Sequence, residues 1–309
     1  MDKKPYIGRF APSPTGPLHF GSLICALGSY LDAHHNAGRW LVRIEDIDPQ
    51  REVPGATTTI LHQLEDHGLV WQGDLLYQSA RLPAYRDALE QLQAAGLTYH
   101  CDCTRQRIVS LGSIYDGHCR HRQLSAQGAI RLLTPAADCA HASLRFNDLV
   151  MGDYQQNLAT QVGDFVLQRR DGLFSYQLAV TVDDLFQNIT HVVRGADLLD
   201  STPRQLYLRQ LYSRECLALP VAQSAAPHFA HLPLATNAEG QKLSKQNFAK
   251  PLLKGDEANN LWQALLWLRQ SPPRELQLCS VQELLDWAIP HWQLAAVPKQ
   301  LNLPAPSSY

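Results

Sequence analysis

The first fifty residues alternate between short apolar runs and polar breaks. Residues 6–11 are largely apolar and predict a strand, whereas the proline-rich stretch 12–17 excludes a helix, because proline removes a backbone donor and fixes φ. Residues 18 to about 33 follow a helical pattern, and 40–44 predict a second strand. Strand, loop, helix and strand in this order form the unit of a parallel sheet, so the sequence predicts an α/β fold.

Further apolar periodicity predicts helices over residues 54–67 and 82–92, and the C-terminal end is expected to be helical, with residues 261–268 strongly apolar. Ser280 and Glu283 form a capping-box pattern ahead of another helix, and the residues from about Val297 onward are expected to be a loose tail.

The helical rhythm is lost between about residues 98 and 160, which predicts an insertion in the sheet domain. Regular structure is expected to return at residues 165–167, 180–182 and 191–195.

Composition narrows the class of protein. The 309 residues are 45% hydrophobic and 18% charged with a net charge of -2, which is typical of a globular chain and not of a strongly basic nucleic-acid binder. The seven cysteines form no disulfide framework, so a reduced compartment is expected. No stretch is long and apolar enough to span a bilayer, and we expect a cytoplasmic protein without a membrane partner.

Two separate segments have the chemistry to bind phosphate. His19 and Gly21 lie where the proline-rich loop gives way to a helix, whose first amides are unpaired donors at the positive end of the helix dipole. Lys242 and Lys245 flank Leu243-Ser244 after a turn, and such a loop can bring cations onto a developing pyrophosphate charge. Each segment alone is more typical of ordinary surface than of a nucleotide site.

Together the two segments resemble the two signatures of class I aminoacyl-tRNA synthetases. The opening Arg9–Gly21 is similar to that of glutamyl-tRNA synthetases almost residue for residue, as is Val42–Asp48. A third block, 176–203, is also similar to that family. Ser22 and Gln246 depart from the signatures, at places where glutamyl enzymes often vary.

The resemblance implies ATP and L-glutamate as substrates, with Mg²⁺ on the nucleotide. His19 and Lys245 are implied as the catalytic pair, and the implied ATP-binding residues are His19, Gly21, Lys242 and Lys245. Activation proceeds by attack of the glutamate α-carboxylate on the α-phosphorus of ATP, so catalysis depends on positioning and charge stabilisation.

An acidic substrate side chain requires permanent cations, and arginine pairs bidentately with carboxylates. The resemblance implies Arg9 and Arg194 for the γ-carboxylate, Glu45 for the α-ammonium group, and Ser13 and Tyr176 as hydrogen-bonding neighbours. The full implied glutamate-binding set is Arg9, Phe10, Ala11, Pro12, Ser13, Glu45, Tyr176 and Arg194. The alternative is that Glu45 belongs to a surface ion-pair cluster, but the end of a parallel strand favours a ligand role.

Cys101, Cys103 and Cys119 lie within a short stretch, and zinc favours clustered thiolates in closed tetrahedral sites. The residues alone offer His100, His118 or His121 as a fourth ligand, and reduced cysteines without metal remain the alternative. The Cys-x-Cys, Tyr, Cys pattern resembles the zinc site of a truncated paralogue of the glutamyl-tRNA synthetases. That resemblance implies Tyr115 as the fourth ligand of one structural Zn²⁺ per chain.

The same resemblance implies a Rossmann-type class I catalytic domain with a parallel sheet, an inserted zinc-bearing subdomain and a short C-terminal helical segment. The expected divisions are 1–97 for the first half of the catalytic domain, 98–160 for the acceptor-like insertion, 161–250 for the second half with the Lys-Leu-Ser-Lys loop, and 251–309 for the helical segment without an anticodon-binding domain.

The truncated paralogue activates glutamate without tRNA and transfers it to queuosine at the wobble position of tRNA(Asp), so the implied RNA partner is that anticodon stem-loop. A monomer is expected. Two other functions are considered: charging of a tRNA 3′ end or a small amine, and a binding role for a decayed synthetase. The presence of His19, Glu45, Arg9 and Lys245 argues against the last of these.

Overall fold

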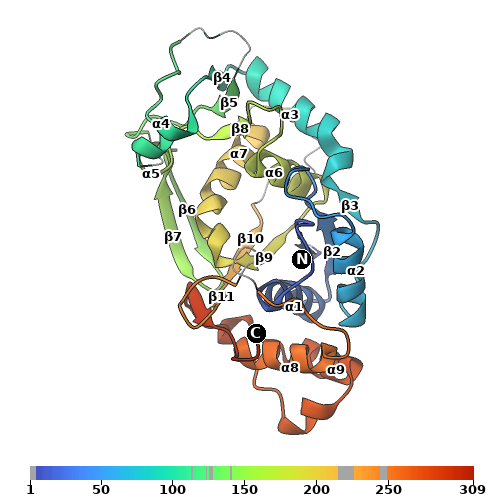
Figure 1. Ribbon diagram of the computed structural model, residues 1–309. Coiled ribbons are helices and arrows are strands. Elements are labelled where there is room, and N and C mark those ends of the chain that lie inside the picture. Colours follow the sequence, from blue (N-terminus) through green and yellow to red (C-terminus); the bar gives the residue numbers. More distant parts are fainter. Residues whose placement is uncertain are drawn as a thin grey trace.

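Parallel strands at the centre of the molecule carry the polar loops that form the candidate site (Figure 1). The computed structural model describes residues 5–112, 114–122, 124, 128–139, 141–214, 226–243 and 249–309. The strands are β1 (Ile7–Phe10), β2 (Arg39–Ile44), β3 (Leu76–Tyr77), β4 (Thr98–Cys101), β5 (Ala129–Leu132), β6 (Ser143–Asp148), β7 (Gly152–Asn157), β8 (Val166–Gln168), β9 (His191–Gly195), β10 (His228–Leu232), β11 (Leu234–Thr236) and β12 (Asn302–Pro304).

Helices connect and cover these strands. The α-helices are α1 (Phe20–His35), α2 (Ala56–Asp66), α3 (Leu82–Ala94), α4 (Arg105–Ser110), α5 (Leu158–Gln161), α6 (Tyr176–Phe186), α7 (Thr202–Arg214), α8 (Glu257–Trp267) and α9 (Val281–His291). Short 3₁₀ segments are η1 (Gln78–Arg81), η2 (Ala196–Ser201), η4 (Arg274–Leu278) and η5 (Leu294–Ala296).

Two groups of parallel strands lie edge to edge. Strands β1, β2 and β3 are parallel, and β10 is parallel to both β9 and β6. The Thr190 amide donates to the Ile7 carbonyl at 2.9 Å, and the Ile7 amide donates to the Thr190 hydroxyl at 2.8 Å, which joins β1 to the chain entering β9. The expected α/β fold with a parallel sheet is confirmed.

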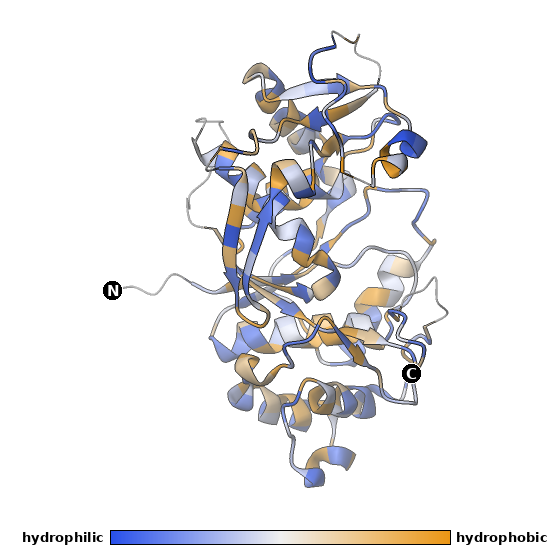
Figure 2. Cartoon of the chain, turned by 90° about the vertical axis from the view of Figure 1, so that its left-hand side faces the viewer, coloured by the Kyte–Doolittle hydropathy of each residue, from blue (hydrophilic) through white to orange (hydrophobic). Residues whose placement is uncertain are grey.

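Residues 98–160, where the helical periodicity is absent, form mainly short strands. Strands β4, β5 and β8 form an antiparallel sheet, and β6 and β7 form a hairpin whose first strand pairs with β10. Figure 2 shows hydrophobic and hydrophilic residues alternating along β6, as expected for a strand with one covered face, whereas β7 is mostly hydrophilic.

Helix α1 is the centre of the larger apolar core. Its inner positions are fully buried, and it packs against β1 and β9 on one side and against α8 and α9 on the other (Figure 1). A second core lies between α3, α6, α7 and the strands β5 and β8. Tyr85 and Leu178 are completely buried in it. The C-terminal helices therefore stabilise the first signature by covering the helix that carries it.

The elements predicted at the N-terminus are present within a few residues of their expected ends, because strong apolar periodicity and proline punctuation act locally. Residues 180–182 belong to α6. The expectation of a loose tail after Val297 was wrong. Strand β12 pairs in parallel with β11, and the Tyr309 ring stacks on Phe20 at 4.2 Å between centroids. Only the tertiary structure provides β11 and Phe20 as partners for this otherwise irregular stretch.

Candidate active site and metal centre

The proline-rich loop after β1 is held by backbone bonds to the segment that follows β2. The Glu45 amide donates to the Pro12 carbonyl at 3.0 Å, and the Val53 amide donates to the Pro14 carbonyl at 3.0 Å. Farther along, the Leu18 amide donates to Gln63 Oε1 at 2.7 Å. Prolines have no amide of their own, so these carbonyl contacts and neighbouring amides fix the loop beside Glu45.

His19 is the N-cap of α1. Its Nδ1 accepts from the Ser22 amide at 3.3 Å, and the Ser22 hydroxyl accepts from the His19 amide at 2.7 Å, which together form a capping box. Ser22, the departure from the first signature, therefore closes the cap. Because Nδ1 is an acceptor, the ring proton is on Nε2, where it suits donation to a phosphate oxygen.

Gly21 lies directly against the His19 ring. A Cβ atom at position 21 would lie 3.1 Å from Cε1 of His19, closer than an ordinary van der Waals contact. A side chain at this position would require the imidazole to shift by a few tenths of an ångström, so glycine fits the packing of the cap best.

Arg9, Arg43 and Glu45 meet around the buried carboxylate of Asp184. Arg9 donates from Nε and Nη2 at 3.1 and 3.3 Å, and Arg43 donates from Nη1 at 2.7 Å. Arg43 Nη2 also reaches Glu45 Oε1 at 3.4 Å. This ion-pair group joins β1, β2 and α6 and holds Arg9 and Glu45 within a single polar site.

Arg194, at the end of β9, is oriented by a second buried network. Its Nε donates to His231 Nε2 at 3.1 Å, and its Nη2 donates to the Thr202 hydroxyl at 2.9 Å and to the Leu198 carbonyl at 3.2 Å. Asp148 Oδ2 accepts from His231 Nδ1 at 2.6 Å, which fixes the histidine tautomer. Only Nη1 remains directed elsewhere, and it donates to the Tyr176 hydroxyl at 3.3 Å.

The two networks face one another. Arg194 and Tyr176 both lie within electrostatic reach of Glu45, Arg9 and Asp184. Burial raises the pKa of the Glu45 carboxyl in spite of Arg43 and Arg9, and burial lowers the pKa of the Arg194 guanidinium. An added cation near Glu45 and an added anion near Arg194 would each favour the charged form of the group.

Of the second phosphate-binding segment, the structure describes Lys242 but not Lys245, which lies in the undescribed stretch 244–248. The Lys242 ammonium forms an ion pair with Asp197 of η2. The chain beyond this loop returns to the first signature, because the Leu252 amide donates to the Leu18 carbonyl at 2.9 Å. The segment after the undescribed stretch is thus bound to the residue just before the N-cap of α1.

Cys101, Cys103 and Cys119 converge at the end of β4. Their sulfur atoms all lie within 4.8 Å of one another, and the Cys103 and Cys119 sulfurs are 3.6 Å apart. Tyr115 Oη lies 3.5 Å from Cys101 Sγ and 3.7 Å from Cys103 Sγ. Ligands of a tetrahedral zinc ion at about 2.3 Å lie roughly 3.8 Å apart, so the donor set fits zinc.

Within the described residues, no histidine joins the three cysteines in this cluster, and His118 and His121 are exposed. Tyr115 is only 4% exposed and is held from two sides. The Arg131 guanidinium lies 3.9 Å from the centre of its ring, and a Cβ atom at Gly163 would collide with the Tyr115 carbonyl. Arg107 and Arg122 donate to the Cys103 and Cys119 sulfurs at 3.7 and 3.8 Å.

Sequence reasoning missed the residues that orient the site. Asp184 lies in the 176–203 block that resembles the synthetases. Nothing in the sequence around it indicates that it pairs with Arg9 and Arg43. Asp148 and His231 come from strands 83 positions apart and have no local signal at all. Such partners are set by strand order, which short-range periodicity does not determine.

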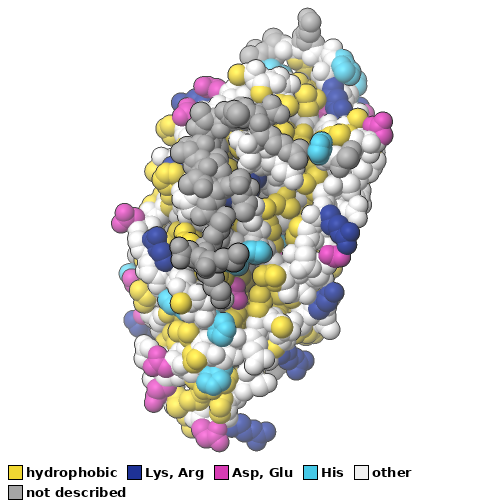
Figure 3. Space-filling view, turned by 180° about the vertical axis from the view of Figure 1, so that it is seen from behind, with side chains coloured by type: hydrophobic (Ala, Val, Ile, Leu, Met, Phe, Trp, Pro, Cys, Tyr) yellow, Lys and Arg dark blue, Asp and Glu magenta, His cyan; other side chains and the backbone are white. Residues whose placement is uncertain are grey.

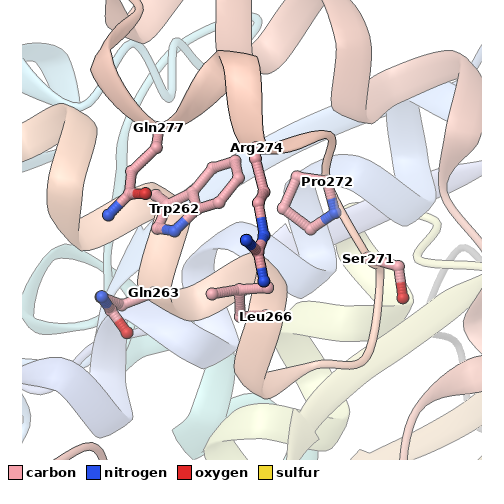
Figure 4. A pocket seen from close by; sticks show the side chains of 7 residues that line it. All are labelled: Trp262, Gln263, Leu266, Ser271, Pro272, Arg274 and Gln277. Carbon is pink, nitrogen blue, oxygen red and sulfur yellow. The ribbon is translucent and has the colours of Figure 1, made fainter.

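A separate surface hollow of about 520 Å³ lies on the C-terminal helices (Figure 4). Arg274 extends between Trp262 and Pro272 there, and it is the single charged residue among those lining the hollow. None of the predicted site residues reaches this hollow, and a lone cation beside glutamines defines no reactive chemistry.

Comparison with known proteins gives the class first. The family described as "tRNA synthetases class I (E and Q), catalytic domain" matches residues 7–285. The crystal structure of a glutamate-tRNA synthetase from Elizabethkingia anophelis superposes with a TM-score of 0.77 at 26% identity, covering 99% of this chain and 69% of that chain. A glutamate tRNA ligase from Elizabethkingia meningosepticum CCUG26117, solved with its amino acid, gives 0.76 at 26% identity, with coverages of 99% and 68%. The chain therefore is a class I synthetase-type ligase.

Curated relatives define the group within that class. "Glutamyl-Q tRNA(Asp) synthetase" of Serratia proteamaculans (strain 568) is 50% identical over 304 residues, covering 97% of this chain and 94% of the relative. The protein of the same name from Cronobacter sakazakii (strain ATCC BAA-894) is 51% identical, with coverages of 96% and 95%. The chain belongs to the glutamyl-Q tRNA(Asp) synthetase family. Within the described residues, no helix combines the length and apolar character needed to cross a membrane.

The Asp184 ion-pair group predicts a specific pH dependence of stability. Burial alone would raise the pKa of Asp184, but Arg9 and Arg43 outweigh it and lower the pKa to about 2. A carboxyl with a depressed pKa contributes stability that is complete above its unfolded pKa near 4 and is lost as the pH falls towards 2. We expect Asp184→Asn to lower the free energy of unfolding at pH 7 by at least roughly 2 kcal/mol.

Urea unfolding of parent and variant at pH 7, 4 and 2.5 measures this difference, with Asp87→Asn on the exposed face of α3 as the control. The stability gap between parent and Asp184→Asn should narrow from pH 4 to 2.5. A difference in the free energy of unfolding of the same size at all three pH values would contradict the lowered pKa of Asp184.

Proposed function

We propose that this protein activates L-glutamate with ATP in the absence of tRNA and transfers the glutamyl group to queuosine at the wobble position of tRNA(Asp). The arrangement of Glu45 and Arg194, opposite charges presented across one polar site, is the observation that carries the proposal. The names of the relatives support the choice of amino acid and of RNA.

Glutamate provides a cation for Glu45 and an anion for Arg194. Its α-ammonium group would pair with Glu45, whose burial disfavours an unpaired carboxylate, and its γ-carboxylate would pair with Nη1 of Arg194. Arg9 adds positive charge beside them, although its guanidinium is also bound to Asp184. The remaining members of the set are Phe10 at the end of β1, Ala11, Pro12, whose carbonyl accepts from the Glu45 amide, Ser13, and Tyr176 with its hydroxyl.

ATP would lie against the start of α1. His19 Nε2 donates to phosphate, Gly21 allows close approach, and Lys242 and Lys245 supply mobile cations. Mg²⁺ accompanies the nucleotide and neutralises phosphate charge. An α-carboxylate oxygen of glutamate attacks the α-phosphorus, the bond to the bridging oxygen breaks, and pyrophosphate leaves.

Transfer needs a nucleophilic hydroxyl in place of a ribose hydroxyl. A cyclopentenediol hydroxyl of queuosine attacks the activated glutamyl carbonyl, loses its proton, and AMP leaves. The same site therefore serves both steps. Only the acceptor hydroxyl differs from that of a tRNA 3′ end, and the activation of glutamate is the same.

For the metal, we propose one structural Zn²⁺ held by Cys101, Cys103, Tyr115 and Cys119. The sulfur spacing and the buried position of Tyr115 support this set over one containing His100, His118 or His121. We also propose that residues 98–160 form the zinc-bearing insertion between catalytic halves at 1–97 and 161–250, followed by the helical segment 251–309.

The activation proposal is tested by ATP–pyrophosphate exchange with glutamate and no RNA, followed by transfer of labelled glutamate to tRNA(Asp) with and without queuosine. We expect exchange without RNA and label only on the queuosine-containing tRNA. Label on the unmodified RNA, or exchange that requires RNA, would reject the corresponding half of the proposal. Glutamine in place of glutamate serves as the control substrate.

Tyr176→Phe isolates the amino-acid contact. Loss of the hydroxyl that accepts from Arg194 should raise KM for glutamate by about tenfold while leaving KM for ATP within about twofold, because a hydrogen bond to a charged group is worth roughly 1.5 kcal/mol. Tyr154→Phe on β7, whose ring packs on Phe146, is the matched control. Equal effects on both KM values would place Tyr176 outside the glutamate site.

Zinc content tests the metal centre directly. Protein purified without chelators should contain about one Zn²⁺ per chain, Cys119→Ser should lose it, and Tyr115→Phe should bind it more weakly in competition with a chromogenic chelator. His118→Ala and His121→Ala should retain parent affinity. Loss of zinc in a histidine variant, with retention in Tyr115→Phe, would replace the tyrosine by that histidine.

A further inference from the structure

A hollow of about 550 Å³ lies between α4, the β5–β8 sheet and the turn after β8. Its charged lining consists of Arg105, Arg131, Arg169 and Arg170 with Asp171, and we call it the arginine pocket. Cys103 of the cysteine cluster forms part of the same wall. The whole chain has a net charge of -2, so four arginines beside one acid are a local concentration of positive charge.

The arginines are not all neutralised. Arg169 pairs with Asp48 at 3.1 Å and with Asp171 at 2.6 Å. Arg170 donates to the Asp102 carbonyl, a neutral acceptor, at 2.8 Å. Across the part of the chain that the structure describes, neither Arg105 nor Arg170 forms an ion pair with a carboxylate.

Arg131 is the buried arginine of the pocket. Its side chain is 8% exposed, its Nη1 donates to the Asp164 carbonyl at 2.6 Å, and its guanidinium covers the Tyr115 ring. Its Nε has no hydrogen-bond partner within the described residues. Arg131 therefore adds positive charge to the floor of the pocket while its guanidinium stays packed on the protein.

The remaining wall is apolar. Ile108 of α4, Ala129 of β5 and Val166 of β8 line the hollow together with the arginines. Cations beside an apolar surface suit a nucleotide of a single strand, whose phosphate pairs with arginine while its base or sugar packs on aliphatic carbon. A free phosphate or a carboxylate would leave this apolar wall exposed to water.

The charged groups elsewhere on the surface are arranged differently. On the face shown in Figure 3, arginines and lysines are dispersed around the rim among acidic residues, and hydrophobic side chains run down the middle. Arg145, on β6, is typical: it is 67% exposed and pairs with Asp153 at 2.6 Å. Such pairs add little affinity for an anion, because the cation is already compensated.

We propose that the arginine pocket binds a phosphate-bearing, single-stranded segment of the RNA substrate, with Arg105 and Arg170 contacting phosphate. This proposal rests on the proposed function, because it assumes that tRNA is the acceptor of the glutamyl group. The Arg169–Asp48 pair links the pocket to the segment following β2 and Glu45, so RNA held here would lie next to the loops that bind glutamate.

The test compares Arg105→Gln and Arg170→Gln in the full chain with Arg86→Gln, an exposed arginine on α3. Binding of queuosine-containing tRNA(Asp) is measured over a range of salt concentrations, together with ATP–pyrophosphate exchange. Each pocket variant should weaken RNA binding by about tenfold and lower the salt dependence by about one ion, with exchange unchanged. Arg86→Gln should bind RNA as the parent does.

Equal RNA affinity for the pocket variants and the parent would overturn the proposal, as would an equal loss in Arg86→Gln. A raised KM for ATP without a loss of RNA affinity would assign the pocket to a free nucleotide and also overturn it. If the parent binds RNA through these arginines but transfers no glutamate, the proposed function fails while the pocket assignment stands.

Discussion

The pairing of Asp184 with Arg9 and Arg43 is the interaction on which the rest of the site depends. Two guanidinium groups from β1 and β2 share one carboxylate from α6, three elements far apart in sequence. Because these charges lie almost entirely out of water, none of them is stable without the others. The group therefore holds the strands, the helix and the side chain of Glu45 in one arrangement before any substrate is present.

A second buried network performs the corresponding task for Arg194. Asp148 of β6 orients His231 of β10, and His231 in turn accepts from Arg194 of β9. Burial lowers the pKa of His231, which keeps its Nε2 available as an acceptor. Nε and Nη2 of Arg194 are bound to His231, Thr202 and Leu198, so the guanidinium is held in one orientation with Nη1 directed towards Tyr176.

The cysteine cluster serves a different purpose from the catalytic site. It joins the end of β4 to the irregular chain around Tyr115 and Cys119, where few apolar contacts are available to define a fold. Three thiols and one phenol converge there at a spacing that fits a tetrahedral metal ion, and a metal bound by them would stabilise the segment without a large core. The arginine pocket lies on the outer wall of this segment, so its shape depends on the same cluster.

The sequence by itself determined the local elements of the first third of the chain and the resemblance of its motifs to a synthetase, because apolar periodicity, prolines and capping residues act over a few positions. It also identified Cys101, Cys103 and Cys119 by their proximity in the chain. Only the tertiary structure decided that Asp184 neutralises Arg9, that His231 orients Arg194, and that residues 302–304 form a strand on β11. These partners are brought together by strand order and packing over long separations, which no local pattern encodes.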